Sequence, residues 1–228
     1  MPRTRPADRL DELLDAALHV FLALGYRRAR MSDVAAAAGV SPGLLYTYAA
    51  GKEALFSLVV RRELGEAVDA IALPVPNPEP GDLERLVVRG VRGIARNPVL
   101  EAAEAVDDPA DAAAELATVV GEIYDSMHRY RRFIRVVERS AVEWPELAEH
   151  FYERGRRPLV RRLARFIARR CASGHYRPVP DPEVAARYVV EIVAWFANHR
   201  YGDHDGARID DAIARETVVQ LVTRGFVG

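Results

Sequence analysis

Residues 41–48 combine hydroxyl groups, small residues and an absence of charge in one short run. The hydroxyls of Tyr46, Thr47 and Tyr48 can hydrogen-bond to phosphate oxygens or to base edges, and the tyrosine rings can contact thymine methyl groups. Gly43 has no side chain to hold the backbone away from a base edge. The combination is suited to contacts inside a groove of double-stranded DNA.

Lys52 adds a positive charge close to this run. It is the only lysine among the 32 basic residues of the chain, which otherwise uses arginine. A compact ammonium near the start of a helix is well suited to a point contact with a phosphate. The alternative is an ordinary surface lysine, because phosphate contacts are common and carry no sequence information. We favour the phosphate contact.

Two short helices joined by a tight turn are needed to position these groups. An alanine-rich helix over residues 33–38 ends at Gly39, since glycine enters the left-handed conformation without steric cost. Ser41 can cap the next helix, which runs to Tyr48, and Pro42 suits its first position because an N–H there would be unpaired. The pattern predicts a helix-turn-helix DNA reader with contacts from Ser41, Pro42, Gly43, Leu44, Tyr46, Thr47, Tyr48 and Lys52.

Four blocks of sequence carry a wider resemblance. They are Val20-Phe21-Leu22-Ala23-Leu24-Gly25-Tyr26, Ser32-Asp33-Val34-Ala35, Gly39-Val40-Ser41-Pro42-Gly43-Leu44-Leu45-Tyr46 and Gly51-Lys52-Glu53-Ala54-Leu55-Phe56. In this order and spacing, over about residues 9–62, the run resembles the DNA-binding domain of the tetracycline-repressor (TetR) family of bacterial transcriptional regulators. The four blocks together are far more specific than a lone helix-turn-helix pattern.

The resemblance implies both a fold and a function. The expected fold is all-α, with a three-helix helix-turn-helix DNA-binding domain at residues 1–65 and a larger helical effector-binding and dimerisation domain at residues 66–228. The expected function is that of a sequence-specific transcriptional regulator, usually a repressor, which binds a palindromic DNA operator as a homodimer. A small, largely apolar effector would release it, and no cofactor is expected.

Two positions depart from the family pattern. Arg30 stands where such proteins usually have a capping threonine, and losing that cap costs about 1 kcal/mol. Ala49 stands where they usually have a phenylalanine after the recognition helix, so either Phe21 or Phe56 fills the space or the helix sits differently. Both changes bear on how the reading helix is seated, and neither removes a DNA contact.

Composition and charge favour a small DNA-binding domain, here called the reading head (residues 1–65), joined to a larger domain. The chain has 228 residues, is 50% hydrophobic and has a formal net charge of −1. Residues 1–65 hold nine basic and seven acidic residues, which leaves a net charge of −3 for the remainder. A non-specific nucleic-acid coat protein is expected to be strongly basic, so DNA affinity here should depend on a few placed contacts and on two copies of the chain.

Cysteine content and apolar runs bear on the compartment. A single cysteine, Cys171, excludes an intrachain disulfide. The absence of a signal-peptide core or long apolar run predicts a cytoplasmic protein.

Beyond the head, helical periodicity continues and prolines and glycines mark the breaks. We expect a connecting helix from Lys52 to about Ile71 and a linker with four prolines at residues 74–82. A single long helical segment should cover residues 110–143. The next helix should cover residues 145–172, with an interruption near Pro158.

Two C-terminal helices, at residues 182–201 and 207–224, are expected to pair. In the family that this chain resembles, such a pair commonly forms a four-helix bundle with its twin, and a helix-turn-helix module generally needs two half-sites. The alternative is that the pair only closes the core of one chain. The predicted interface residues are Tyr188, Ile192, Trp195, Phe196, Ile213, Val218, Leu221 and Val222.

Aromatic and polar-tipped residues of the larger domain are candidates for an effector cavity. Core packing is the simpler interpretation of each one, but together they suit a largely apolar ligand held by a few hydrogen bonds. The candidates are Tyr124, His128, Tyr130, Trp144, Phe151, Tyr152 and Trp195.

The sequence does not favour an enzyme. Its six histidines are scattered, and no metal-ligand spacing, nucleophile elbow or phosphate-binding loop occurs. We therefore expect neither catalytic residues nor a metal site. Two other functions stay open at this point: an architectural DNA binder that needs no effector, and a helical carrier of small molecules that has lost DNA binding.

Overall fold

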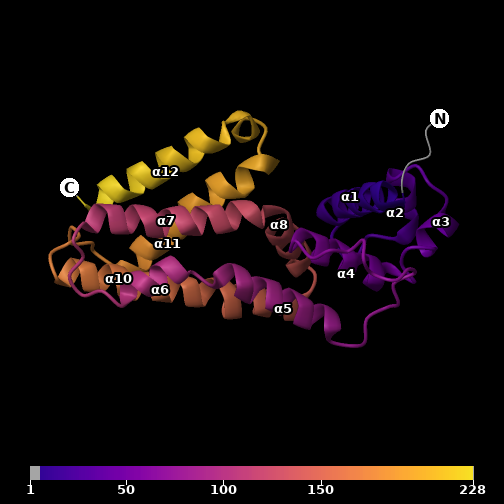
Figure 1. Ribbon diagram of the computed structural model, residues 1–228, viewed down its shortest axis with the longest axis horizontal. Coiled ribbons are helices and arrows are strands. Elements are labelled where there is room, and N and C mark those ends of the chain that lie inside the picture. The colour runs from indigo at the N-terminus through magenta and orange to yellow at the C-terminus, as the bar shows by residue number, and fades with distance from the viewer. Residues whose placement is uncertain (1–5, 228) are drawn as a thin grey trace. The chain divides into compact units, whose positions relative to one another are not determined.

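A computed structural model describes residues 6–227 of the chain. Helices joined by loops and short turns make up this described part, which contains no β-strand (Figure 1). The all-α prediction is thereby confirmed. The chain divides into two compact units, of which the first runs to Val91 and includes Arg132–Tyr152, and the second combines Arg92–Arg131 with the chain from Glu153 onward.

The first unit contains the predicted reading head. Helices α1 and α4 pack against each other, α2 packs on α1, and α3 packs on α2. Phe21 and Phe56 meet edge to face in the core of this unit, with ring centroids 5.1 Å apart, and both are fully buried. Its helices are α1 (Pro6–Leu24), α2 (Met31–Ala37), α3 (Pro42–Tyr46), α4 (Lys52–Glu63), most of α5 (Asp82–Ala95), α8 (Arg131–Ala141) and α9 (Pro145–Ala148).

Helix α4 is shorter than the sequence predicted. It ends at Glu63, and the backbone turns at Gly65, whose φ of +81° lies in the left-handed region. The N–H of Gly65 donates to the carbonyl of Arg62, and the N–H of Glu66 donates to that of Arg61. These are the bonds of a glycine-terminated helix end, so the expected connecting helix to Ile71 was wrong.

The proline-rich segment after α4 returns to the end of the recognition helix. Val75 accepts a hydrogen bond from the N–H of Ala50 at 2.8 Å and donates its own N–H to the carbonyl of Tyr48 at 2.9 Å. Asn77 lies beside Gly51, where an added Cβ would come within 2.7 Å of the amide oxygen. The linker therefore pairs with the backbone that follows α3.

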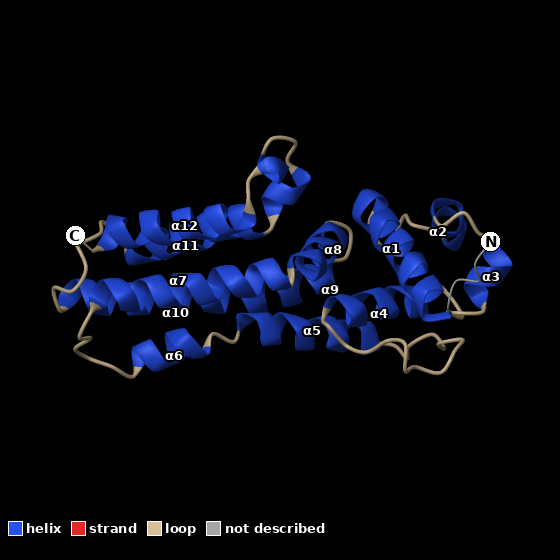
Figure 2. Cartoon of the chain, turned by 45° about the horizontal axis from the view of Figure 1, so that its top comes forward, coloured by secondary structure: helices blue, strands red, loops and turns tan. Residues whose placement is uncertain are grey.

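The second unit is a helical bundle with a single apolar core. Helices α10 and α11 pack together, and α7 packs against both α11 and α12 (Figure 2). Leu163, Val189 and Val193 are among the fully buried residues of its core. The main helices are α6 (Pro98–Glu104), α7 (Ala112–Arg129), α10 (Arg157–Ala172), α11 (Pro182–Ala197) and α12 (Asp211–Phe226).

One predicted long helical segment is divided in two, and the interruption predicted near Pro158 is present. The expected segment at residues 110–143 is two helices, α7 and α8, because Tyr130 leaves the helical region with φ −99° and ψ 17°. The expected helix at residues 145–172 contains a π-helical stretch, Glu149–Arg156, before α10. Pro158 has no N–H to give to a carbonyl one turn earlier, which accounts for the altered bonding just before it.

A buried arginine organises the turn between α11 and α12. The Arg200 side chain is fully buried, donates to the carbonyls of Phe196 at 2.6 Å and Ile209 at 2.7 Å, and pairs with Asp211. Two short 3-10 turns, His199–Gly202 and Gly206–Arg208, lie in this connection. The two C-terminal helices are consequently separated by a longer ordered turn than the sequence predicted.

In the part of the chain that the structure describes, no helix has both the length and the apolar character needed to cross a membrane.

Candidate nucleic-acid interface

Helix α3 is anchored by few but well-placed contacts. Ser41 caps it, since its hydroxyl accepts the N–H of Leu44 at 3.3 Å, and Pro42 occupies the first turn. Leu45 is fully buried and holds the helix to the head. The hydroxyl of Thr47 donates to the carbonyl of Leu44 at 2.6 Å. The helix ends at Tyr46, two residues earlier than predicted, and Thr47 is its C-cap.

The outer surface of α3 matches the predicted contact surface. Pro42, Gly43 and Thr47 are exposed, and Tyr46 is 49% exposed. An added Cβ at Gly43 would meet nothing within 4 Å, so the space in front of this glycine is open. Of the other candidates Ser41 is exposed, and Leu44 and Tyr48 are half-buried.

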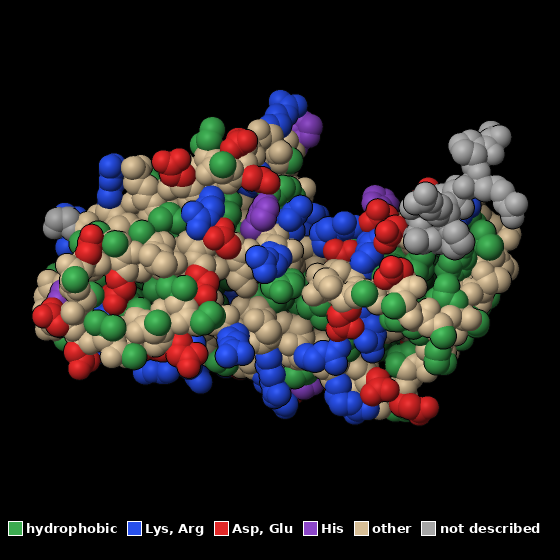
Figure 3. All heavy atoms as spheres, in the orientation of Figure 1, with side chains coloured by type: hydrophobic (Ala, Val, Ile, Leu, Met, Phe, Trp, Pro, Cys, Tyr) green, Lys and Arg blue, Asp and Glu red, His purple; other side chains and the backbone are tan. Residues whose placement is uncertain are grey.

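Charge is not concentrated on one side of either unit in the view of Figure 3. On that face, basic and acidic side chains are interspersed rather than gathered into a single basic patch. Interspersed charge agrees with the small net charge of the chain.

Lys52 is held inward. Its ammonium donates to the carbonyl of Arg27 at 3.1 Å and lies 4.7 Å from the ring centroid of Tyr26. The residue is half-buried at the start of α4. The contacts give Lys52 a role in joining α4 to the turn after α1, and its contact with phosphate stays a prediction.

The two departures from the family pattern have local solutions. The N–H of Arg30 donates to the carboxylate of Asp33 at 2.9 Å, so Asp33 supplies half of a capping box in place of the missing threonine. Ala49 is fully buried, as are Phe21 and Phe56 in the core of the same unit. Tyr48 and Ala50, the neighbours of Ala49 in sequence, pair with the proline-rich segment. This pairing supports the end of α3 and was not predicted from the sequence.

Tyr26 connects several parts of the first unit. Its hydroxyl donates to Glu53 at 3.1 Å, and its ring stacks on that of Trp144, with centroids 5.0 Å apart and planes 25° apart. The Phe56 ring lies 4.7 Å away. Burial first, and then the negative charges of Glu53 and Glu84, raise the pKa of the Tyr26 phenol above its usual range.

Trp144 thus packs on the reading head, although the sequence assigned it to an effector cavity. The periodicity around residue 144 could not reveal a partner 118 positions earlier in the chain. Helix α8 is tied to the same head. Asp15 pairs with Arg62 at 2.9 Å and with Arg132, and Arg132 lies 3.3 Å from Glu63. The compact unit therefore extends beyond the proposed boundary at residue 65.

The other predicted effector residues fall in both units. In the second unit Tyr124 is buried and stacks on His128 with centroids 6.3 Å apart. The Nδ1 atom of His128 lies 3.2 Å from the hydroxyl of Tyr201, and burial together with the charge of Arg131 lowers the pKa of His128. Tyr130 is half-buried in the same unit. The structure thus brings together Tyr124 and His128 with a polar network.

Phe151 and Tyr152 belong to the first unit and meet edge to face, with centroids 5.0 Å apart. Phe151 is buried, and Tyr152 is 38% exposed. Trp195 belongs to the second unit, is 38% exposed and packs edge to face on Phe196. Trp195 therefore fits the predicted interface better than a cavity wall.

The predicted interface residues separate into two groups. Tyr188, Ile213 and Leu221 are largely exposed on α11 and α12. Val218 and Val222 are buried in the core of their own unit, so intrachain packing already accounts for them. Val184, which the sequence analysis missed, is 67% exposed on α11. The exposed or half-exposed apolar stripe comprises Val184, Tyr188, Ile192, Trp195, Phe196, Ile213 and Leu221.

Residues 6–227 include no group of three or more histidine, cysteine, aspartate or glutamate side chains placed to bind a metal ion.

Solved structures share this fold across nearly the whole chain. A TetR-family regulatory protein from Rhodococcus RHA1 is 22% identical, with 97% of each chain covered and a TM-score of 0.51. A TetR-like regulator from Rhodococcus sp. RHA1 is 21% identical, with 98% of each covered and the same TM-score. The ketosteroid transcriptional regulator KstR2 of Mycobacterium tuberculosis is 16% identical, with 100% of this chain and 97% of that chain covered and a TM-score of 0.54.

Two family models match the sequence, although no curated protein matches it significantly. Residues 13–59 match the bacterial regulatory proteins of the tetR family. Residues 124–223 match the C-terminal domain of AefR-like transcriptional repressors. With the helix-turn-helix geometry of α2 and α3, these two matches show that the chain belongs to the TetR family of bacterial transcriptional regulators.

Proposed function

We propose that the protein is a repressor that reads a palindromic DNA operator as a homodimer and is released by a small, largely apolar molecule. The observation that carries the proposal is the surface of α3, where Pro42, Gly43, Tyr46 and Thr47 are exposed on a helix anchored from behind by Leu45. Small residues and hydroxyls allow a close approach to base edges without charge.

The contacts assigned to DNA are the exposed and half-buried residues of this helix and its flanks. Tyr46 and Thr47 offer groups to base edges, and the Ser41 hydroxyl and the backbone at the start of α3 can bind phosphate. Leu44, Tyr48 and Lys52 are the other predicted contacts, and all three are half-buried. The match to AefR-like repressors supports repression as the mode of action.

Dimerisation is supported by the apolar stripe on α11 and α12. Val184, Tyr188, Ile213 and Leu221 are each more than half exposed, which is unusual for large apolar side chains on one helix pair. A second copy of the chain would bury the stripe in an isologous contact. Two reading heads could then meet successive major grooves, which are about 34–36 Å apart.

The proposed effector site lies in the second unit near Tyr124 and His128. Their rings stack, and His128 reaches the Tyr201 hydroxyl, which donates to Asp211 at 2.6 Å. Aromatic walls with a few polar tips suit an apolar ligand that carries one or two hydrogen-bonding groups. Tyr130 is close to them in sequence and is the third residue proposed for the effector site in this unit.

Selection of binding sites from random double-stranded DNA tests the proposal. The whole wild-type protein should enrich an inverted repeat with half-sites about one helical turn apart. An architectural DNA binder would retain DNA without enriching one sequence, and a carrier without DNA binding would retain none. Either of those outcomes contradicts the proposal.

Gly43→Val supplies the matched variant for the selection. Because the space in front of Gly43 is open, the new side chain should leave the fold intact and block only the approach to DNA. Gly93→Val is the control, since Gly93 is also an exposed helical glycine with nothing within 4 Å. The first variant should enrich no repeat, and the second should enrich the wild-type repeat.

A further inference from the structure

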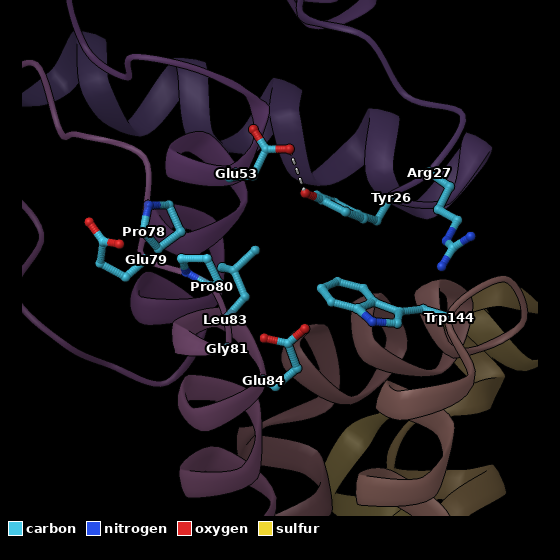
Figure 4. Close-up of a pocket in the computed structure, with 10 residues that line it drawn as sticks. All are labelled: Tyr26, Arg27, Glu53, Pro78, Glu79, Pro80, Gly81, Leu83, Glu84 and Trp144. Atoms are coloured by element: carbon cyan, nitrogen blue, oxygen red, sulfur yellow. Dashed lines mark hydrogen bonds between the residues drawn. The ribbon is translucent and has the colours of Figure 1, made fainter.

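A hollow of about 310 Å³ opens within the first unit, beside the start of α4 (Figure 4). Its walls come from four parts of the unit: the turn after α1, the first turn of α4, the proline-rich segment with the start of α5, and the residue that precedes α9. Its volume lies at the small end of the range for ligand pockets, about 300–1,000 Å³. The residues that define its chemistry are Tyr26, Glu53, Glu84 and Trp144.

Aromatic rings form one wall of the hollow. Tyr26 and Trp144 stack, and the indole borders the hollow between Tyr26 and Glu84 (Figure 4). Trp144 is buried against the protein, with 9% of its surface exposed. Aromatic π faces attract cations, and aromatic walls are the usual means of recognising quaternary ammonium groups.

Carboxylates stand on opposite sides of this wall. Glu53 lies above the rings and accepts the hydrogen bond from Tyr26, whereas Glu84 lies below them (Figure 4). Within the described chain, the half-buried carboxylate of Glu84 makes no hydrogen bond or ion pair. The hollow therefore contains one carboxylate that lacks a partner, next to rings that favour positive charge.

Positive groups near the hollow only partly offset this charge. Arg27 lies at the edge beyond Trp144 (Figure 4) and is exposed to solvent. Lys52 lies over the Tyr26 ring, and its ammonium is already bonded to the carbonyl of Arg27. Glu79 adds a third carboxylate to the lining, although it points away from the rings. An anion at the rings would be repelled by Glu84, whereas a cation there would be attracted by Glu84 and by the ring faces.

We propose that this hollow is a binding site for a small organic ammonium ion, distinct from the effector site proposed in the second unit. The ammonium group is placed beside Glu84 and against the Trp144 indole. The contacts are a charge pair with Glu84 and cation–π attraction to the ring. A ligand here touches the turn after α1, the start of α4 and the linker that pairs with the end of the recognition helix.

Choline and its neutral isostere 3,3-dimethyl-1-butanol test the site, because the two differ in charge at nearly constant shape. Binding to the whole wild-type protein is followed by calorimetry and by tryptophan fluorescence, to which Trp144 and Trp195 both contribute. Choline should bind and perturb the tryptophan signal, and the neutral alcohol should bind at least about tenfold more weakly. Equal binding of both compounds would overturn the proposal, as would no binding of choline.

Glu84→Gln removes the unpartnered charge at constant shape and should weaken choline binding about tenfold. The control is Glu146→Gln, which removes the same charge from the exposed surface of α9, two residues after Trp144 and outside the hollow. That control should bind choline as the wild type does. Equal losses in both variants would show a general surface attraction and contradict the site. Neither experiment uses DNA, so failure here leaves the proposed DNA-binding function untouched.

Discussion

Two exposed surfaces of the protein differ in chemistry. The outer face of α3 presents glycine, proline and hydroxyl groups on a five-residue helix, and its backbone is within reach of a partner. The faces of α11 and α12 present large apolar side chains on two 16-residue helices. The first surface offers hydrogen bonds and close approach, whereas the second offers apolar area to bury.

The difference indicates two kinds of partner. Binding in a polar, hydrated DNA groove is strengthened by well-placed hydrogen bonds and by small residues. Apolar area alone adds little to the affinity. Binding of a second copy of the chain is favoured instead by large apolar side chains, because dimer interfaces are enriched in apolar and aromatic residues. We therefore propose separate functions for exposed Tyr46 and exposed Leu221.

The largest expected effect comes from a charge in the apolar stripe. Leu221→Glu should weaken dimerisation roughly 100-fold, about 3 kcal/mol, because an unpaired carboxylate would be buried in the interface. Sedimentation over a concentration series measures the change. DNA affinity should fall with it, since one head alone loses the second half-site.

Ala212→Glu is the control for this prediction. It adds the same charge to an exposed position in the first turn of α12, where a carboxylate suits the helix dipole. The control should remain a dimer. If both variants, or neither, dissociate, the apolar stripe does not make the interface.

A side chain at Gly43 should have the next largest effect. Gly43→Val should weaken binding to the selected duplex about 30-fold, about 2 kcal/mol, by holding the α3 backbone away from base edges. Its dimerisation and its thermal unfolding should match those of Gly93→Val. An unchanged DNA affinity would remove α3 from the groove.

Local signals in the sequence predicted the reading head well. The cap at Ser41, the proline at position 42 and the turn at Gly39 each act over a few residues, so they could be recognised without a structure. The predicted start at residue 182 agrees with α11, whereas α12 begins at Asp211 and not at residue 207 as predicted. Helix type and order follow from such signals together with apolar periodicity.

Features that depend on distant parts of the chain were missed. The pairing of Val75 with Tyr48 and Ala50 joins residues about 25 positions apart, and no local pattern marks it. The stacking of Trp144 on Tyr26 is more distant still. Predicted helix ends are too long where apolar periodicity continues past a stop, as at Gly65, because periodicity alone does not show where a left-handed residue ends the helix.

The linker provides a test of how firmly the reading surface is seated. Val75→Pro removes the N–H that donates to Tyr48 and should weaken DNA binding about fivefold, about 1 kcal/mol, while dimerisation stays unchanged. Val75→Ala keeps that N–H and serves as the matched control. Equal DNA affinities for the two variants would mean that the side chain, and not the backbone pairing, matters.

The smallest effect is expected at Lys52, where a salt titration separates two roles. If the ammonium leaves Arg27 to bind a phosphate, Lys52→Ala should reduce the slope of log affinity against log salt by about 0.9 per half-site. If it stays on Arg27 and Tyr26, the variant should unfold at lower temperature with an unchanged slope. We expect the reduced slope, and an unchanged slope would assign Lys52 to the architecture of the head alone.

The central claim is that the two surfaces act together on one DNA site. Sedimentation of the selected duplex with the wild-type protein tests it most directly, because the mass of the complex counts the chains bound per inverted repeat. We predict at least two chains per repeat, and loss of tight binding when Leu221→Glu makes the protein monomeric. A single chain bound to the repeat with full affinity would contradict the account.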